Sequence, residues 1–234
     1  SNYDKVYVLV DENTKEHCLP ALFQGMDFFK EAEIIEIEPG EESKSIEICA
    51  QIWEMMLVTG ATRNSVLVNL GGGVITDMGG FVASTFKRGI DFIHIPTTLL
   101  GQVDAAIGGK TGVNLEYSKN QVGTFAHPLF TFIDSQFLRT LPQREFVSGM
   151  GEVIKYSLII EEKLLSLISS SLSLNDNLNE IIKTCIEIKQ GIVNRDYRET
   201  GERKKLNFGH TIGHAIESFS KGNLFHGEAI AIGM

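Results

Sequence analysis

The sequence predicts an α/β fold in two parts, a mostly parallel sheet domain over residues 1–142 followed by an α-helical domain over residues 143–234. Short apolar segments alternate with segments of helical periodicity in the first part, a pattern typical of a parallel sheet with helices on both faces. Strand signals cease after Pro142, and only helical periodicity follows. The 43% hydrophobic and 22% charged residues are those of a globular protein rather than a disordered one.

The first part contains signals for four strands and one long helix. The expected strands lie at residues 6–10, 33–38, 65–70 and 92–95. Apolar residues recur at helical spacing between residues 45 and 58, and we expect the preceding Ser43 to cap that helix. Because ligands of parallel sheets bind beyond the carboxyl ends of the strands, the binding site is expected at that edge.

The second part contains signals for helices alone. We expect them at residues 153–160, 163–171 and 178–193 and from His210 onward, with a loop over residues 169–179. The apolar run at residues 228–234 contains no stop signal, so we expect a truncated helical domain that continues beyond Met234. Residues 1–234 alone should then fold the sheet domain but hold their last helix weakly, since isolated short helices are marginal in water.

Composition and charge exclude several classes of function. A net charge of −9 disfavours nucleic acid and anionic membranes as partners, since both require a basic surface. Three widely spaced cysteines favour a reducing, cytoplasmic location over a disulfide framework, and no apolar run reaches the roughly 18–20 residues of a membrane span. Residues 87–155 contain seven Lys/Arg and six Asp/Glu, so this stretch could hold a small anionic ligand or be an ordinary solvated surface.

Three glycines, Gly71 to Gly73, stand between an apolar strand and a helix-like stretch that contains Asp77. Glycine lets a backbone approach pyrophosphate closely, and the next helix offers free N–H groups, as in Rossmann-like folds. A tight strand-to-helix turn without a ligand explains the pattern equally well. A second glycine cluster at residues 108–112 is similar to the end of a P-loop, but Asp104 stands where that motif requires glycine, which disfavours a Walker ATPase.

Histidines form the second group of candidate site residues. His210 and His214 lie one turn apart on an expected helix, and His226 follows in a His-Gly-Glu sequence. Such residues share a metal, divide the work of ligand and acid–base catalyst, or simply satisfy a helix surface. The glutamate of a zincin HExxH motif is absent between the pair. Glu152 could supply a carboxylate, although Glu152 and Lys155 at i and i+3 would ordinarily form a surface ion pair.

Five blocks of sequence together resemble the 3-dehydroquinate synthase family. They lie in the family's order at residues 71–81, 96–114, 149–156, 206–218 and 226–234. A looser similarity connects the chain with other sugar-phosphate cyclases and with iron-dependent alcohol and glycerol dehydrogenases. The resemblance implies a Rossmann-like NAD-binding domain followed by a helical metal- and substrate-binding domain. Ala105 and Ala106 depart from the family, whose members often carry serine there.

The resemblance also implies roles for individual residues. It implies a metal ion, Zn²⁺ or Co²⁺, on Glu152, His210 and His226, and catalytic roles for His214, Lys155, Asp104 and Asn207. It implies substrate contacts at Arg88, Lys110, Lys119, Asn120, Lys189 and Arg203, with Arg88 reaching the phosphate site of the neighbouring subunit in a homodimer. It implies NAD contacts at Asp11, Glu41, Lys44, Gly72, Gly73, Val74, Asp77, Thr97, Thr98, Lys110, Lys119, Phe137 and Thr140.

The activity implied is the conversion of 3-deoxy-D-arabino-heptulosonate 7-phosphate to 3-dehydroquinate and phosphate in the shikimate pathway. In this family NAD oxidises a substrate hydroxyl, phosphate leaves by β-elimination and the hydride returns, so no net redox change occurs. The several lysines and arginines would offset the charge of such a sugar phosphate. The alternatives are another sugar-phosphate cyclase, a metal-dependent NAD alcohol or polyol dehydrogenase, and a non-catalytic dinucleotide-binding module. If the helical domain is truncated, His226 should be the least firmly held ligand.

Overall fold

The computed structural model describes residues 3–25, 27–115, 118–170, 177–220 and 222–234, and the chain divides into two compact units. Unit 1 comprises Ser1–Thr97 and Gly109–Phe137, and unit 2 comprises Thr98–Gly108 and Leu138–Met234. This division differs from the expected boundary after residue 142, because residues 98–108 pack with the helices. Lys189 donates to the main-chain oxygen of Asp104 at 2.7 Å, and Arg203 donates to that of Gly108 at 2.9 Å.

Unit 1 is built on a four-stranded parallel sheet in the order β2-β1-β3-β4. The strands are β1 (Val6–Asp11), β2 (Glu33–Ile37), β3 (Val66–Gly71) and β4 (Asp91–Pro96). All four strands expected from the sequence are therefore present. The central strand β3 is buried at every position, as expected of a parallel strand that is covered on both faces.

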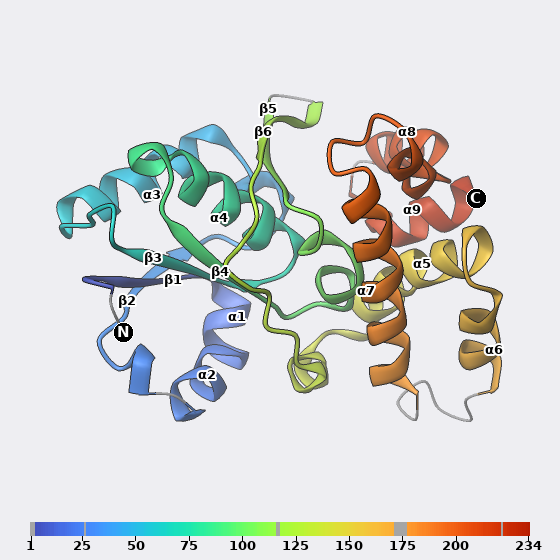
Figure 1. Ribbon diagram of the computed structural model, residues 1–234, viewed down its shortest axis with the longest axis horizontal. Coiled ribbons are helices and arrows are strands. Elements are labelled where there is room, and N and C mark those ends of the chain that lie inside the picture. Colours follow the sequence, from blue (N-terminus) through green and yellow to red (C-terminus); the bar gives the residue numbers. More distant parts are fainter. Residues whose placement is uncertain (1–2, 26, 116–117, 171–176, 221) are drawn as a thin grey trace. The chain divides into compact units, whose positions relative to one another are not determined.

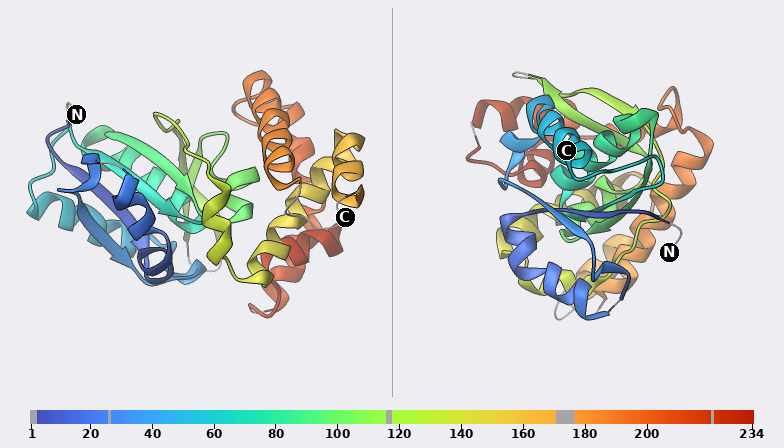
Figure 2. Two further views of the ribbon diagram at one scale, coloured as in Figure 1. Left: turned by 90° about the horizontal axis from the view of Figure 1, so that it is seen from below. Right: turned by 90° about the vertical axis from the view of Figure 1, so that its left-hand side faces the viewer.

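Helices cover both faces of this sheet (Figures 1 and 2). Helices α1 (Glu12–His17) and α2 (Leu19–Gly25) pack on one face, and α3 (Ile46–Val58) and α4 (Gly73–Thr85) pack on the other. Side chains of β1 alternate between the two cores, as the period of a strand requires. The expected α/β class is confirmed, and ligands are expected at the carboxyl edge of the sheet.

The N-cap of α3 differs from the expected one. Ser45, not Ser43, caps the helix, and its Oγ accepts a hydrogen bond from the main-chain N–H of Ile48 at 3.4 Å. Ser43 instead ends the short 3-10 helix η2 (Glu41–Ser43), one residue before Lys44. The expectation for Ser43 was wrong because the helix begins at Ile46, where its apolar pattern begins, and Ser45 is the residue directly before it. The segment that precedes Ser45 is thereby free to present Glu41 and Lys44.

An antiparallel hairpin that the sequence did not predict completes unit 1. It consists of β5 (Lys110–Leu115) and β6 (Ser118–Phe125), and Gly112 lies opposite Gly123. A Cβ on Gly123 would lie 2.1 Å from the main-chain oxygen of Thr111, so this crossing requires glycine. Strand β6 is exposed at seven of its eight positions and begins with four polar residues, so it lacks the apolar alternation by which a strand is recognised.

Unit 2 consists of helices. They are α5 (Gln143–Ile159), α6 (Glu162–Ser170), α7 (Leu178–Arg195), α8 (His210–Ser220) and α9 (His226–Gly233), with the shorter η4 (Gly101–Ala105) and η6 (Glu202–Asn207). Helix α5 begins ten residues before its expected start, because the glycines near its middle hide its periodicity. Residues 171–176 of the expected loop lie outside the described residues, and the expectation was wrong for residues 169–170 and 178–179, which belong to α6 and α7. Among the described helices, none combines the length and hydropathy that crossing a bilayer requires.

Glycines allow α5 and α9 to touch backbone to backbone. A Cβ on Gly151 of α5 would lie 2.5 Å from the main-chain oxygen of Gly227, and a Cβ on Gly227 would lie 1.7 Å from that of Ser148. The Ser148 hydroxyl accepts a hydrogen bond from the N–H of Gly227 at 3.0 Å. Glu152 follows Gly151, and His226 precedes Gly227, so this contact brings these two side chains together.

We expect Gly151→Ala to lower the free energy of unfolding by about 1–3 kcal/mol, because the added methyl group must push α9 away from α5. Gly191→Ala in the middle of α7 is the matched control, since its Cβ would meet only the Arg195 guanidinium at 3.5 Å. Urea denaturation followed by circular dichroism measures both. Equal midpoints for the two variants would show that the close approach at Gly151 does not matter.

Candidate metal and active site

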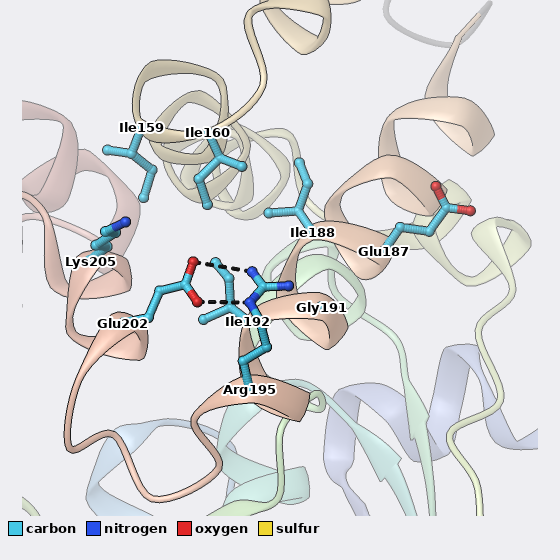
Figure 3. Close-up of a pocket in the computed structure, with 9 residues that line it drawn as sticks. All are labelled: Ile159, Ile160, Glu187, Ile188, Gly191, Ile192, Arg195, Glu202 and Lys205. Atoms are coloured by element: carbon cyan, nitrogen blue, oxygen red, sulfur yellow. Dashed lines mark hydrogen bonds and ion pairs between the residues drawn. The ribbon is translucent and has the colours of Figure 1, made fainter.

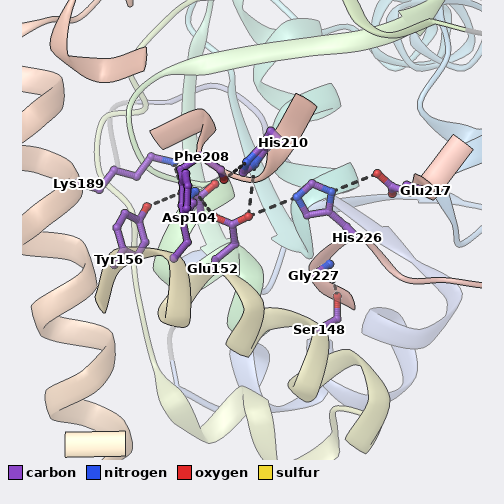
Figure 4. A network of polar contacts seen from close by, with 11 residues as sticks. Asp104, Ser148, Glu152, Tyr156, Lys189, Phe208, His210, Glu217, His226 and Gly227 are labelled. Carbon is purple, nitrogen blue, oxygen red and sulfur yellow. Dashed lines mark hydrogen bonds and ion pairs between the residues drawn. The ribbon is translucent and has the colours of Figure 1, made fainter. Parts of the chain in front are cut away.

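Glu152 is the buried centre of unit 2 (Figure 4). Its Oε1 lies 3.4 Å from Nε2 of His210 and 3.4 Å from Nε2 of His226, and its Oε2 accepts a hydrogen bond from Lys155. The carboxylate comes from α5, and the imidazoles come from the first residues of α8 and α9. Three helices thus converge on one carboxylate, and Glu152 and Lys155 form a buried pair rather than the surface pair the sequence would ordinarily suggest.

The geometry of this site suits a cation. Glu152 Oε1 is buried and accepts no hydrogen bond from any described residue, although two imidazole nitrogens face it. Ligand atoms of His210, His214 and His226 also lie within 4.8 Å of one another, which offers a second possible set of three. Two histidines and one carboxylate form a donor set typical of catalytic zinc sites, with room for further ligands.

The two imidazoles beside Glu152 differ in their electrostatics. Burial lowers the pKa of His210. Burial would also lower the pKa of His226, but the carboxylates of Glu152 and Glu217, which face its two ring nitrogens, raise that pKa to about 9. Nδ1 of His226 lies 3.3 Å from Oε2 of Glu217 on α8. Glu217 therefore orients the ring so that Nε2 faces Glu152, as carboxylates commonly do for metal-binding histidines.

Asp104 is the centre of a second cluster, in which two lysines lie beside its carboxylate. Its Oδ1 lies 2.9 Å from Nζ of Lys189 and 3.9 Å from Nζ of Lys155, and it accepts a hydrogen bond from the Tyr156 hydroxyl. Burial would raise the pKa of Asp104, but the charges of Lys189 and Lys155 outweigh it and hold that pKa below its usual range. Burial lowers the pKa of Lys189 even though Asp104 opposes the change. A second anion beside Lys189 would therefore be favoured.

Two further predicted site residues, Arg203 and Asn207, lie on η6. Arg203 is buried, and its guanidinium donates to the main-chain oxygens of Tyr197 at 2.6 Å and Gly108 at 2.9 Å. Asn207 is exposed, and its amide donates to Glu199 at 2.5 Å. His214 is also exposed, one turn after His210, with ring centroids 5.2 Å apart. The structure thus places the predicted metal and catalytic residues in unit 2, together with two of the substrate residues, Lys189 and Arg203.

The predicted cofactor residues lie mainly in unit 1, around the end of β3. Gly72 is the N-cap of α4 and makes no side-chain cap, so the first N–H groups of this helix remain available to an anion. A Cβ on Gly71 would lie 2.5 Å from Ile75, which makes glycine necessary for this tight turn. Lys44 is buried and donates to Asp77 of α4 at 2.6 Å, which joins the residue 41–44 segment to the glycine turn.

The remaining predicted residues are placed differently. Asp11 caps α1 by accepting from the N–H of Thr14 at 2.8 Å, and the Phe137 side chain lies in the apolar core beneath the sheet. Thr98 and Thr140 belong to unit 2, whereas the other cofactor candidates belong to unit 1. The others lie in unit 1, where they are exposed or half-buried except for buried Thr97: Gly73, Val74, Arg88, Thr97, Lys110, Lys119 and Asn120.

Sequence reasoning missed Tyr156 and Glu217, which contact Asp104 and His226. Tyr156 follows Lys155 directly, and Glu217 lies three residues after His214, so neither has a spacing that distinguishes it from an ordinary helical residue. Their roles depend on contacts between separate helices.

A cavity of about 320 Å³ in unit 2 is lined by none of the predicted site residues. The ion pair between Arg195 and Glu202 forms part of its lining (Figure 3).

Comparisons with known proteins agree in the family they indicate. The family model for the 3-dehydroquinate synthase N-terminal domain matches residues 34–148, and that for the C-terminal domain matches residues 149–234. The chain is 48% identical to the 3-dehydroquinate synthase of Parabacteroides distasonis, over 99% of this chain and 67% of the relative. The identity to that of Alkaliphilus metalliredigens is 46%, over 99% and 66%. The chain thus spans about two thirds of the length of these relatives.

Solved structures of two other synthases are also similar. A 2-deoxy-scyllo-inosose synthase complexed with carbaglucose-6-phosphate, NAD⁺ and Co²⁺ is 32% identical, with a TM-score of 0.87 over 100% of this chain and 66% of that chain. The 2-epi-5-epi-valiolone synthase of Streptomyces hygroscopicus, with NAD⁺ and Zn²⁺ bound, is 28% identical, with a TM-score of 0.89 over 98% and 66%. An iron-containing alcohol dehydrogenase of Thermotoga maritima shares the fold at 18% identity and a TM-score of 0.68.

Replacing Glu152, His210 or His226 by alanine should in each case remove about one equivalent of bound zinc, because a site that loses one of three protein ligands binds the ion far more weakly. His214→Ala is the matched control and should retain the zinc. Elemental analysis after dialysis measures the metal, and circular dichroism confirms the fold. Zinc lost from the His214 variant but kept by the Glu152 variant would instead assign the ion to the three histidines.

Proposed function

The chain belongs to the 3-dehydroquinate synthase family, and from this premise we propose that it carries out the conversion of 3-deoxy-D-arabino-heptulosonate 7-phosphate to 3-dehydroquinate and phosphate. The observation that carries the proposal is the buried Glu152 of unit 2, with two imidazoles on one oxygen and a lysine on the other. A buried carboxylate so arranged is costly unless it serves a cation and a charged ligand. The family supplies the identity of that ligand.

The residues present fit both implied cofactors. The unsatisfied Oε1 of Glu152 between two imidazole nitrogens fits a divalent metal, which when bound would lower the pKa of substrate hydroxyls. The uncapped N-terminus of α4 after Gly71 and Gly72 fits a pyrophosphate, and the NAD that carries it would accept a hydride and return it. The relatives' bound NAD⁺, Co²⁺ and Zn²⁺ support the same pair of cofactors.

The charged side chains of unit 2 suit an anionic substrate. We assign Lys155 and Lys189 to the negative groups of the sugar phosphate, because Asp104 and Glu152 hold these cations in place. The two carboxylates balance the two ammonium groups, and a bound divalent metal would add the positive charge that favours an anion. Arg203 and Asn207 are assigned to the same substrate. Asp104 also accepts a hydrogen bond from the Tyr156 hydroxyl, which helps to hold the carboxylate between the two lysines. The site is thereby charged and rigid before binding, which favours recognition of a phosphate and a carboxylate.

His214 is the residue we assign to proton transfer. Its imidazole is exposed on α8, and its ring centroid lies 5.7 Å from that of His226. An imidazole that is not itself committed to a metal can take a proton from a bound substrate and return it near neutral pH. His214 would hold and move that proton, while His210 and His226 hold the metal.

Two alternatives follow from the similar structures. A different sugar-phosphate cyclase would share the metal, the cofactor and the lysines, but the relatives at 46–48% identity are 3-dehydroquinate synthases, whereas the other synthases share 28–32%. A plain alcohol dehydrogenase would not require the cations around Asp104. Turnover of heptulosonate phosphate against glucose 6-phosphate, whose carba analogue one neighbour binds, separates the first alternative.

We further propose a cytoplasmic homodimer in which Arg88 reaches the partner's phosphate site. Arg88 is exposed and follows Lys87 in a short segment where both residues adopt left-handed backbone, with φ of 71° and 49°. Holding two such residues side by side costs energy, which suits a side chain that must project in a defined direction. The three cysteines are buried, in keeping with a reducing compartment.

The protein, supplied with zinc and NAD, should release phosphate from heptulosonate phosphate for many turnovers per NAD, because the cofactor is regenerated in each cycle. Phosphate release and NADH absorbance are followed in the same cuvette. Glu152→Gln keeps the shape of the side chain but removes its charge, and it should abolish release. Accumulation of NADH in proportion to product would contradict a synthase and favour a dehydrogenase.

Gly72→Val should abolish NAD binding while leaving the fold intact. Gly72 has a φ of −76°, which valine tolerates, but its side chain would occupy the space that pyrophosphate needs beside the N-terminus of α4. Calorimetric titration with NAD measures the affinity, and the thermal midpoint checks the fold. An unchanged affinity would mean that the glycines serve only the turn.

A further inference from the structure

Asn114 joins two groups of predicted site residues in unit 1 and belongs to neither. It lies near the end of β5, and its main-chain N–H donates to the oxygen of Lys44 at 2.8 Å. Its side-chain amide donates to Glu41 Oε1 at 2.8 Å and accepts from the N–H of Asn120 at 2.9 Å. Glu41 and Lys44 are predicted NAD residues, and Asn120 is a predicted substrate residue. One asparagine therefore connects the two groups through three hydrogen bonds.

Lys44 closes this connection into a ring. Its ammonium donates to Asn120 Oδ1 at 2.6 Å and to Asp77 Oδ2 at 2.6 Å, and its side chain is 5% exposed. Burial would lower the pKa of Lys44, but the charges of Asp77 and Glu41 raise it, so the ammonium stays charged. The ring therefore runs from Lys44 through Asn114 and Asn120 back to Lys44, and Asp77 links it to the glycine turn.

The ring holds the end of the hairpin that carries Asn120, whereas buried Val113 and the contacts of Thr124 hold the rest. Strand β6 is almost wholly exposed, so little apolar burial holds it. Asn120 has a φ of 54°, a left-handed conformation that asparagine tolerates better than most residues but that still needs support. The hydrogen bond from its N–H to Asn114 and the one from Lys44 to its side chain supply that support.

We propose that Asn114 is a positioning residue that transmits NAD binding at the Glu41–Lys44 segment to the hairpin carrying Lys119 and Asn120. NAD orders the segment that it contacts, and through Asn114 that ordering extends to the hairpin. The hairpin then loses less conformational entropy when the sugar phosphate binds, so the two ligands bind with positive coupling. The identity of the ligands rests on the proposed function, whereas the connection itself rests on the hydrogen bonds of unit 1.

The experiment is hydrogen–deuterium exchange by mass spectrometry with and without saturating NAD. In the wild-type protein, NAD should slow exchange in peptides covering residues 118–125 as well as those covering residues 41–45. In Asn114→Ala the slowing at residues 120–125 should be lost, whereas slowing at residues 41–45 and at Lys119, itself a predicted NAD contact, should remain. Asn114→Asp loses the donor to Glu41 and sets two carboxylates side by side, so it should lose the protection of the hairpin as Asn114→Ala does. Gln121→Ala is the control, because Gln121 is exposed on β6 and its amide donates to the main chain of Lys119.

Steady-state kinetics supply a second readout. Asn114→Ala should raise the KM for heptulosonate phosphate about tenfold with little change in kcat, since lost hydrogen bonds of this kind weaken binding rather than chemistry. Asn114→Asp, which also loses the donor to Glu41, should raise the KM by a similar factor. A protein in which NAD leaves the hairpin unprotected, or in which Asn114→Ala shows the wild-type protection, overturns the inference. Absence of turnover with the predicted exchange pattern would instead reject the proposed substrate and leave the role of Asn114 intact.

Discussion

The buried carboxylate of Glu152 is the constraint on which the arrangement of unit 2 depends. An isolated charge in a protein interior costs several kcal/mol, so a carboxylate that is wholly buried must be compensated. Lys155 from the same helix compensates one oxygen, and the imidazoles of His210 and His226 face the other. Asp104 and Lys189 extend the charge balance to a second cluster. The helices of unit 2 therefore pack around these charged side chains.

That packing is possible because glycine stands where helices meet. Gly151 and Gly227 allow α5 and α9 to touch through their backbones. Gly213 also allows α8 to approach α9 closely, since a Cβ there would lie 3.0 Å from the main-chain oxygen of Ala229. Each of these glycines adjoins, or lies on the same helix as, a residue that faces Glu152. The same logic operates in unit 1, where Gly71 permits the turn that exposes the N-terminus of α4. Glycines at these contacts thus allow the backbones to approach closely enough for the polar side chains nearby to come into contact.

The sequence predicts the parallel sheet well because its strands are apolar runs of ordinary length, and its motifs identify the metal candidates. It does not predict the hairpin, whose strand β6 is polar and exposed, nor the cap at Ser45, which depends on where α3 actually begins. Asn114 and Glu217 carry no pattern of their own. Their partners come from other elements, 73 residues away for Asn114 and Glu41, and only a three-dimensional arrangement reveals such pairs.

The central claim is that Glu152, His210 and His226 together hold a catalytic metal ion. The most direct measurement is anomalous scattering at the zinc edge from crystals grown with zinc and NAD. Our account predicts one peak about 2.0–2.2 Å from the Nε2 atoms of His210 and His226 and from a carboxylate oxygen of Glu152. A peak bound by the three histidines and out of reach of Glu152 would contradict it.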